Sequence, residues 1–129
     1  MAGKIVADTL EHSTAGSIAT NYVVNGSAKA WVNINGSSGT PIARDSLSLS
    51  SLVDSGTGIY QVNLSNAMNA ADYSICIGGN YLLTGFVFNA SAPCNTYTTS
   101  QFEFECWNTV WDTRLDYEYV SGEINGDLA

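Results

Sequence analysis

The chain has 129 residues, of which 45% are hydrophobic and 12% are charged. This composition excludes a disordered chain and is enough for one modest hydrophobic core. The net charge is −8 with only four Lys and Arg residues, so the clustered cations that nucleic acids and anionic membrane surfaces require are excluded. No run approaches the roughly 20 apolar residues that cross a bilayer, and we expect no membrane insertion.

Residues 1–27 differ from the rest of the chain because they contain too few apolar residues for a core of their own. We expect short strands at 4–10 and 21–24, with a polar linker at 11–17. The segment is either the ordinary start of the following domain or an arm that packs on a neighbouring molecule. In the second interpretation, the candidate anchoring residues are Lys4, Ile5, Val6 and Leu10.

Residues 28–129 contain short alternating stretches separated by turn sequences. In the first stretch Ala30, Val32 and Ile34 alternate with other residues and lead to the turn sequence Asn35-Gly36. Such alternation is typical of strands with one buried face, and Asn-Gly is typical of hairpin turns. The stretches recur often enough to predict an all-β domain, an antiparallel β-sandwich or jelly roll of seven to eight strands with an N-terminal arm.

The middle of the chain continues the pattern. Leucines alternate imperfectly with serines at 47–52, which predicts one strand with a solvated face. The sequence Asp-Ser-Gly-Thr-Gly at 54–58 predicts a tight turn, and strict alternation at 60–64 predicts the next strand. Residues 66–72 are expected to form a loop or a single helical turn.

The remainder of the chain begins with a predicted strand at 73–80. The almost continuous apolar run at 82–88 predicts a central strand that is covered on both faces. A long polar loop is expected at 90–100, an aromatic turn at 107–111 and a further strand at 115–120.

Catalytic chemistry has few candidates in this sequence. Glu103 and Glu105 share one face of a predicted strand that we expect to face solvent, where acidic residues usually serve solubility rather than glycoside cleavage. His12 is the one histidine and lies in the polar N-terminal segment, which does not suit a Ser-His-Asp relay. We predict a non-enzymatic protein with no catalytic residues and no cofactor.

Acidic residues are concentrated at one end of the sequence. Seven of the twelve lie in the last 29 residues, opposed there by Arg114 alone. We favour a solvated, mutually repelling face. A divalent-cation site is the alternative, but the spaced Asp loop that binds calcium is absent, and we predict no metal site.

The three cysteines are Cys76, Cys94 and Cys106, and none forms a CxxC pair. An odd number argues against a disulfide framework, so we expect reduced thiols. Cys76 and Cys106 fall within alternating stretches, where we expect them to be buried as small hydrophobic residues.

Aromatic residues are the remaining candidates for recognition. We expect Trp31 and Trp107 to fill the core, because β-sandwiches bury large rings. Trp111 lies in a predicted turn beside Asp112 and is expected to be exposed, with Tyr97 in the preceding loop. Exposed aromatic rings beside carboxylates can hold sugars, which makes Tyr97, Trp111 and Asp112 the candidate ligand-binding residues.

One stretch resembles a known module. Ala30-Trp-Val-Asn33 with Asn35-Gly36, Arg44-Asp-Ser46, Gly56-Thr-Gly-Ile-Tyr60 with Val62-Asn63, and Ala67-Met68 with Asp72-Tyr73 resemble virion surface proteins of marine bacteriophages, of the tail-fibre-like or capsid-decoration type. The resemblance covers about residues 29–75. It implies a structural and adhesive role in a β-rich, commonly trimeric assembly, and it supplies no catalytic residues.

The sequence therefore leads to three functional hypotheses. The first is a virion decoration or head-fibre subunit, a homotrimer that is made in the host cytoplasm and binds other virion proteins through residues 1–27. The second is a receptor-binding fibre tip that recognises a host surface glycan through the loops at 89–100 and 107–114. The third is a stand-alone carbohydrate-binding module. No secretory signal is visible at the N-terminus.

Overall fold

The structure is a computed structural model that describes residues 3, 5–80, 97–108 and 112–128. The predicted strand at 82–88 and most of the predicted loop at 90–100 lie outside the described residues. The same holds for Lys4, Cys94 and Trp111.

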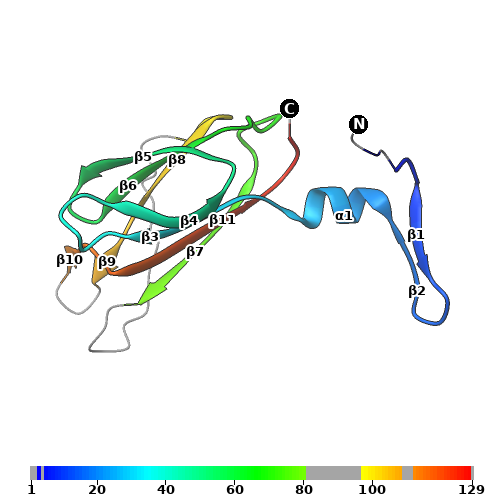
Figure 1. The fold of residues 1–129 in the computed structure, drawn as a ribbon, viewed down its shortest axis with the longest axis horizontal. Helices are drawn as coiled ribbons and strands as arrows, with labels where there is room; N and C mark the ends of the chain where they lie inside the picture. The colour runs from blue at the N-terminus through cyan, green and yellow to red at the C-terminus, as the bar shows by residue number, and fades with distance from the viewer. Residues whose placement is uncertain (1–2, 4, 81–96, 109–111, 129) are drawn as a thin grey trace.

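Two antiparallel sheets form a β-sandwich in the described part of the chain (Figure 1). One sheet has the strand order β4-β3-β11-β7, and the other has the order β5-β6-β8. The strands of the first sheet are β3 (Ala28–Asn35), β4 (Ile42–Leu47), β7 (Ser74–Asn80) and β11 (Tyr119–Asn125). Those of the second are β5 (Leu49–Gly56), β6 (Ile59–Leu64) and β8 (Gln101–Glu105). The predicted all-β class and sandwich architecture are confirmed.

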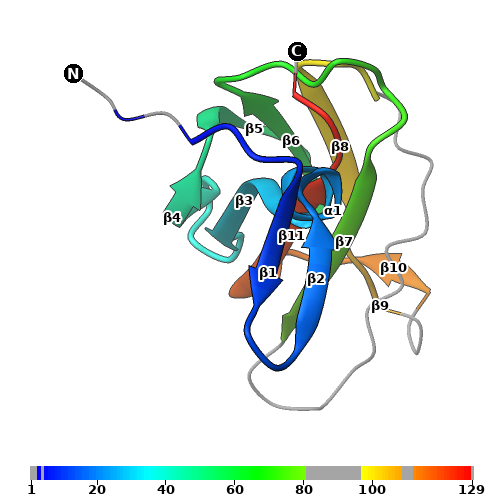
Figure 2. The ribbon, with the colours of Figure 1, turned by 90° about the vertical axis from the view of Figure 1, so that its right-hand side faces the viewer.

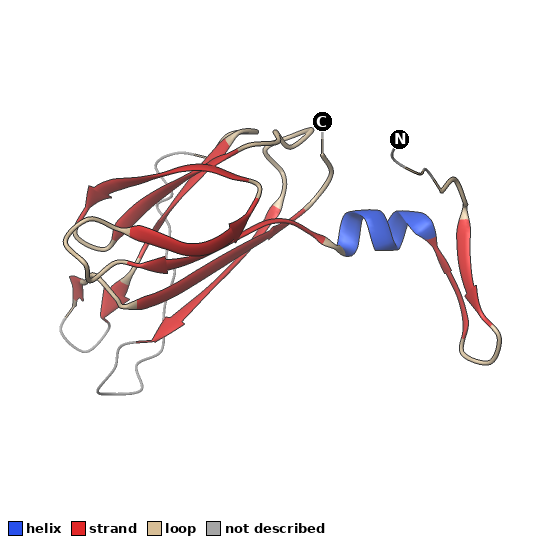
Figure 3. Ribbon diagram, viewed as in Figure 1, coloured by secondary structure: helices blue, strands red, loops and turns tan. Residues whose placement is uncertain are grey.

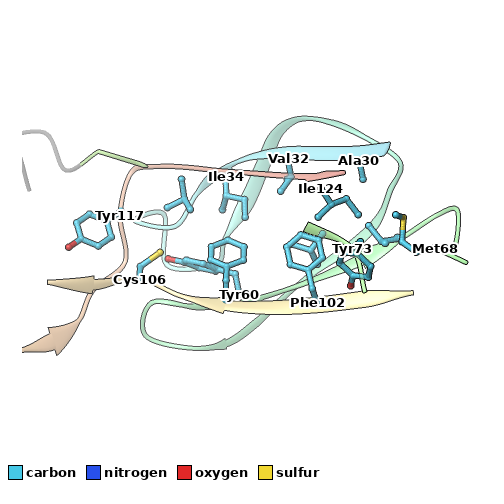
Figure 4. Packing of buried hydrophobic residues seen from close by; sticks show 14 residues of the cluster. Ala30, Val32, Ile34, Tyr60, Met68, Tyr73, Phe102, Cys106, Tyr117 and Ile124 are labelled. Carbon is cyan, nitrogen blue, oxygen red and sulfur yellow. The ribbon is translucent and has the colours of Figure 1, made fainter. Parts of the chain in front are cut away.

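The core lies between the two sheets (Figure 4). Strand β6 shows the alternation clearly, because Tyr60, Val62 and Leu64 are buried while the residues between them are half-exposed. Burying one such side chain stabilises the fold by about 1.5–3 kcal/mol. The buried hydrophobic residues are Ala30, Val32, Ile34, Tyr60, Val62, Leu64, Met68, Tyr73, Phe102, Phe104, Cys106, Tyr117, Val120 and Ile124.

The predicted turn at 54–58 is confirmed and is packed tightly. It joins β5 to β6, and Gly56 and Gly58 have φ angles of 134° and 65°, a region that favours glycine. A Cβ on Gly58 would lie 2.8 Å from the carbonyl oxygens of Cys106 and Leu115. This turn therefore requires glycine for both its conformation and its packing.

The single strand predicted at 47–52 is wrong, since the chain changes sheets at Ser48. This residue has a φ angle of 57°, which ends β4 at Leu47 and starts β5 at Leu49. The Ser48 carbonyl accepts a hydrogen bond from Ser65 N at 2.8 Å, and its hydroxyl accepts one from Asn66 Nδ2 at 3.2 Å. The residues at 66–72 form a loop.

The strand predicted at 115–120 is also wrong in its position. A short hairpin pairs β9 (Trp107–Asn108) with β10 (Thr113–Arg114), and β11 begins only at Tyr119. Tyr117 lies between them and is buried at one end of the core, beside Cys106 in Figure 4. Its ring closes the end of the sandwich, a role that needs no strand.

Residues 5–27 form a segment that projects from the sandwich, which we call the arm (Figures 1 and 2). It contains a hairpin of β1 (Thr9–His12) and β2 (Gly16–Ala19), followed by α1 (Thr20–Gly26). The expected linker at 11–17 is thus part of a hairpin, and the expected strand at 21–24 is helical (Figure 3). Neither segment offers enough periodicity for its type to be read, because a four-residue strand and a seven-residue helix are too short.

Candidate functional site

The arm buries almost none of its apolar surface within its own chain. Helix α1 has no buried residue, and its N-cap, Ala19, makes no side-chain cap hydrogen bond. The strands of the hairpin are four residues long and carry no buried residue. A two-stranded hairpin and a two-turn helix are each marginal in water, so this segment gains little stability by itself.

Several large apolar side chains of the arm are exposed. Ile5 and Val6 precede β1 and are 92% and 81% exposed. Leu10 and Ile18 lie directly opposite each other in the hairpin, each 46% exposed. On α1 the exposed large apolar residues are Tyr22, Val23 and Val24. Three of the four candidate anchoring residues, Ile5, Val6 and Leu10, are thus accessible, while Lys4 lies outside the described residues.

Hydrogen bonds hold the arm together internally. Thr20 donates from its hydroxyl to Ala7 O at 2.7 Å and from its backbone N–H to Asp8 O at 2.9 Å. His12 Nδ1 accepts from the backbone N–H of Ala15 at 3.1 Å, within the hairpin turn. This histidine therefore stabilises a turn, and it lies on the exposed arm rather than in a cleft.

The two candidate ligand-binding residues that the structure describes, Tyr97 and Asp112, are not brought together. Tyr97 stacks on Tyr73 with ring centroids 4.5 Å apart, and its hydroxyl donates to Tyr73 O. Asp112 instead lines a hollow of about 490 Å³ with Trp107 and Arg114, beside the β5–β6 turn. Since Tyr73 lies at the opposite end of the core from Cys106 (Figure 4), Tyr97 and Asp112 occupy opposite ends of the sandwich.

The expectation that Glu103 and Glu105 face solvent is wrong. Both are buried, with exposed fractions of 6% for Glu103 and 1% for Glu105. The Glu105 carboxylate accepts from Arg114 Nη2 at 2.8 Å and from the Trp107 indole N–H at 2.7 Å. Burial alone would raise the pKa of Glu105, but these two donors and the Arg114 charge together lower it. Glu105 is therefore held as a paired carboxylate rather than poised as a general acid.

The ion pair explains why Arg114 stands among acidic residues in the sequence. Its guanidinium lies 5.1 Å from the centroid of the Trp107 ring and reaches Glu105 across the β9–β10 hairpin. Trp107 is accordingly half-buried under Arg114 rather than fully in the core. The sequence signals that Arg114 pairs with an acid, because it is the one cation among seven acidic residues in the last 29 positions. It does not signal which acid or ring Arg114 contacts.

A second polar cluster lies near the same end of the sandwich. The Asp116 carboxylate accepts from Gly58 N at 2.7 Å and from the Tyr60 hydroxyl at 2.9 Å. Burial, together with this hydrogen bond and the Asp116 charge, raises the pKa of the Tyr60 phenol. Burial and Asp116 also raise the pKa of the Cys106 thiol to about 12. Cys106 is thus a protonated core residue, as expected, and not a nucleophile.

Besides that of Trp107, two further expectations of core burial are wrong. Cys76 is exposed on β7. Its neighbours Ile75 and Ile77 pack against the core, and period-two alternation then turns Cys76 outward. Trp31 is 36% exposed on β3, because its neighbours Ala30 and Val32 take the buried positions.

Comparisons of the chain with family models, with curated proteins and with solved structures find no match. Across the described ranges, no group of three or more His, Cys, Asp or Glu side chains is arranged to hold a metal ion. No helix in those ranges is long and apolar enough to cross a membrane.

Proposed function

We propose that the chain is a non-enzymatic structural protein of a bacteriophage virion surface, a decoration or head-fibre subunit that attaches through its arm. The observation that carries this proposal is the arm itself, which exposes Ile5, Val6, Tyr22 and Val24 while α1 buries nothing. The phage assignment is supported by the resemblance of residues 29–75 to marine phage surface modules.

The physical argument concerns what would keep the arm folded. Exposed apolar side chains gain about 25 cal/mol for each Å² that a partner covers. A short hairpin and helix that are marginal alone become stable when a partner surface buries that area. The sandwich, in contrast, has its own core, and we expect it to fold without a partner. In this proposal the arm is the anchor and the sandwich is the domain displayed on the surface.

The resemblance also leads us to propose a homotrimer. Light scattering on the purified full-length chain tests this, with an expected mass three times the 13.7 kDa of one chain. A mass of 13.7 kDa at all concentrations contradicts the trimer, but it leaves attachment through the arm open to its own test.

The attachment test uses particles of the encoding phage, examined by cryo-EM. We expect the double variant Ile5→Ser, Val6→Ser to lose occupancy on the particle, because it removes the two most exposed apolar side chains of the arm. Val53→Ser is the matched control, since Val53 is 41% exposed on the sandwich strand β5. Normal occupancy of the double variant would sink the anchoring proposal.

A receptor-binding fibre tip is the second candidate. The hollow that Asp112 shares with Trp107 and Arg114 favours it, because an aromatic ring and charged groups there could contact a host glycan. Host adsorption with the Asp112→Asn variant discriminates between the two candidates, because Asp112 lines this hollow. A decoration subunit predicts unchanged adsorption, whereas a fibre tip predicts a strong loss.

A further inference from the structure

The outer face of the four-stranded sheet carries a hollow of about 380 Å³ that is separate from the arm and from the Asp112 hollow. Three strands contribute to it in register. Trp31 on β3 lies opposite Glu123 on β11, which lies opposite Cys76 on β7. In the next row, Asn33, Ser121 and Gly78 occupy the equivalent positions. The hollow therefore combines one aromatic ring with several small polar groups.

Gly78 opens this hollow. A Cβ added there would meet no atom of the described residues within 4 Å. Gly78 is also not among the glycines with positive φ, so its backbone does not require glycine. Glycine in the interior of a strand weakens the strand and often marks a place where a ligand approaches closely. The absence of a side chain at Gly78 therefore leaves open part of the space that forms the hollow.

Trp31 forms one side of the hollow and is partly exposed. Full burial of a Trp side chain would stabilise the fold, yet Trp31 remains 36% exposed beside Leu47, which is 46% exposed and directly opposite on β4. A partly exposed indole ring that lines a hollow can serve as a platform for stacking. The strand backbone fixes its position before any ligand arrives, which lowers the entropy cost of binding.

Polar side chains lie on the β11 side of Trp31 in the lining of the hollow. Asn33 Nδ2 donates to Ser121 Oγ at 3.0 Å, a hydrogen bond that does not use the Asn33 amide oxygen as an acceptor. The Glu123 carboxylate accepts from Asn125 Nδ2 at 3.1 Å and retains further acceptor sites. The lining contains donors and acceptors but no Lys or Arg. An anionic ligand would meet Glu123 without any compensating cation.

We propose that this face binds an uncharged hexopyranose unit of a glycan. The apolar C–H face of the sugar ring stacks on Trp31, and its hydroxyls exchange hydrogen bonds with Asn33, Ser121 and Glu123. The volume lies in the range of small-molecule sites, about 300–1,000 Å³. This site goes beyond attachment through the arm and does not depend on it, so the two proposals succeed or fail separately.

The experiment is an NMR titration of the full-length chain with the methyl glycosides of glucose, galactose, mannose and N-acetylglucosamine. We expect at least one glycoside to shift the amide signals of Gly78, Ser121 and Gly122 and the indole signal of Trp31. Gly78→Leu fills the hollow without a clash, and Trp31→Ala removes the platform. Each should weaken binding by about tenfold or more, the loss of about 1.4 kcal/mol.

The matched control is Gly26→Leu, which adds the same side chain at a glycine that also has nothing within 4 Å but lies at the end of α1. It should bind the sugar as the unaltered chain does. Undiminished binding by Gly78→Leu overturns the proposal, as does the absence of shifts on this face with all four glycosides.

Shifts with lysine methyl ester alone would overturn the proposal by assigning the face to cations. A change in oligomer mass in Trp31→Ala would assign it to contacts between copies.

Discussion

The carboxylate of Glu105 is buried in a protein that has few cations, and a single arginine makes this possible. Arg114 and the Trp107 indole satisfy both of its oxygens, at 2.8 and 2.7 Å. A buried carboxylate without such partners would cost several kcal/mol or take up a proton. The Arg114 side chain remains 39% exposed, so the pair is only partly shielded from solvent. Because Glu105 must be ionised to form this pair, the contribution of the pair to stability should depend on pH.

The pH prediction follows from the lowered pKa of Glu105. An unfolded Glu titrates near 4.3, so the pair contributes its full stability above about pH 5 and loses it as the pH falls through the lower, folded pKa. Glu105→Gln should cost about 1–3 kcal/mol at pH 7 and much less in acid. Urea unfolding of both proteins from neutral to acid pH measures this difference.

The control for this experiment is Glu123→Gln, which removes the same charge from an exposed position on β11. It should leave the free energy of unfolding at pH 7 nearly unchanged, as exposed substitutions usually do. A constant difference between Glu105→Gln and the unaltered chain across the pH range would contradict the role of the ion pair.

Among the elements, the β5–β6 hairpin shows most clearly what the sequence could predict. Its glycine-rich turn and the alternation of Tyr60, Val62 and Leu64 are both local signals, and both are confirmed. In contrast, the burial of Glu105 depends on Arg114, nine residues away, and on the β9–β10 pairing that brings them together. Local alternation records which side of a strand is polar, but not what covers it.

The position of Cys76, unlike the burial of Glu105, follows from local alternation alone. The alternation that places Ile75 and Ile77 against the core also requires Cys76 to point outward, so its exposure was readable from the pattern. The helical state of residues 21–24 was not readable, because seven residues without a buried face leave no periodic signal. The sequence thus predicted the sandwich well, the arm's conformation poorly and the buried ion pair not at all.

The β5–β6 turn also gives a stability prediction. Gly58→Ala should destabilise the fold by about 3 kcal/mol or more, because the new Cβ meets backbone oxygens that cannot move aside. Gly39→Ala is the control, since Gly39 also has a positive φ, 84°, but has nothing within 4 Å of its Cβ. It should show only the conformational strain, about 1 kcal/mol. Equal losses in thermal or urea unfolding would exclude a packing role for Gly58.

The whole molecule consists of a sandwich with a core and an arm without one. The elements of the arm contact mainly each other, β1 with β2 and β2 with α1. The backbone passes directly from α1 through Ser27 into β3. We therefore expect the sandwich to be an independent folding unit.

Deletion of residues 1–27 tests this independence. The free energy of unfolding of the remaining chain should stay within about 0.5 kcal/mol of the full-length value, because no core residue is removed. Urea denaturation followed by Tyr and Trp fluorescence provides the measurement. A loss of several kcal/mol would show that the arm packs on the sandwich in solution, and then its apolar surface would not be free for a partner.

Strand β3 runs from the arm to the opposite end of the sandwich, and this has a practical consequence for displaying foreign peptides. Ala28 at the start of β3 pairs with Asn125 at the end of β11, so both lie at the end of the sandwich that bears the arm. The exposed turn that follows β3, with Ser37, Ser38 and Gly39, lies at the far end (Figure 1). An epitope grafted into this turn would lie at the end of the sandwich farthest from the surface to which the arm attaches. Antibody labelling of intact particles would then report which end of the sandwich points outward.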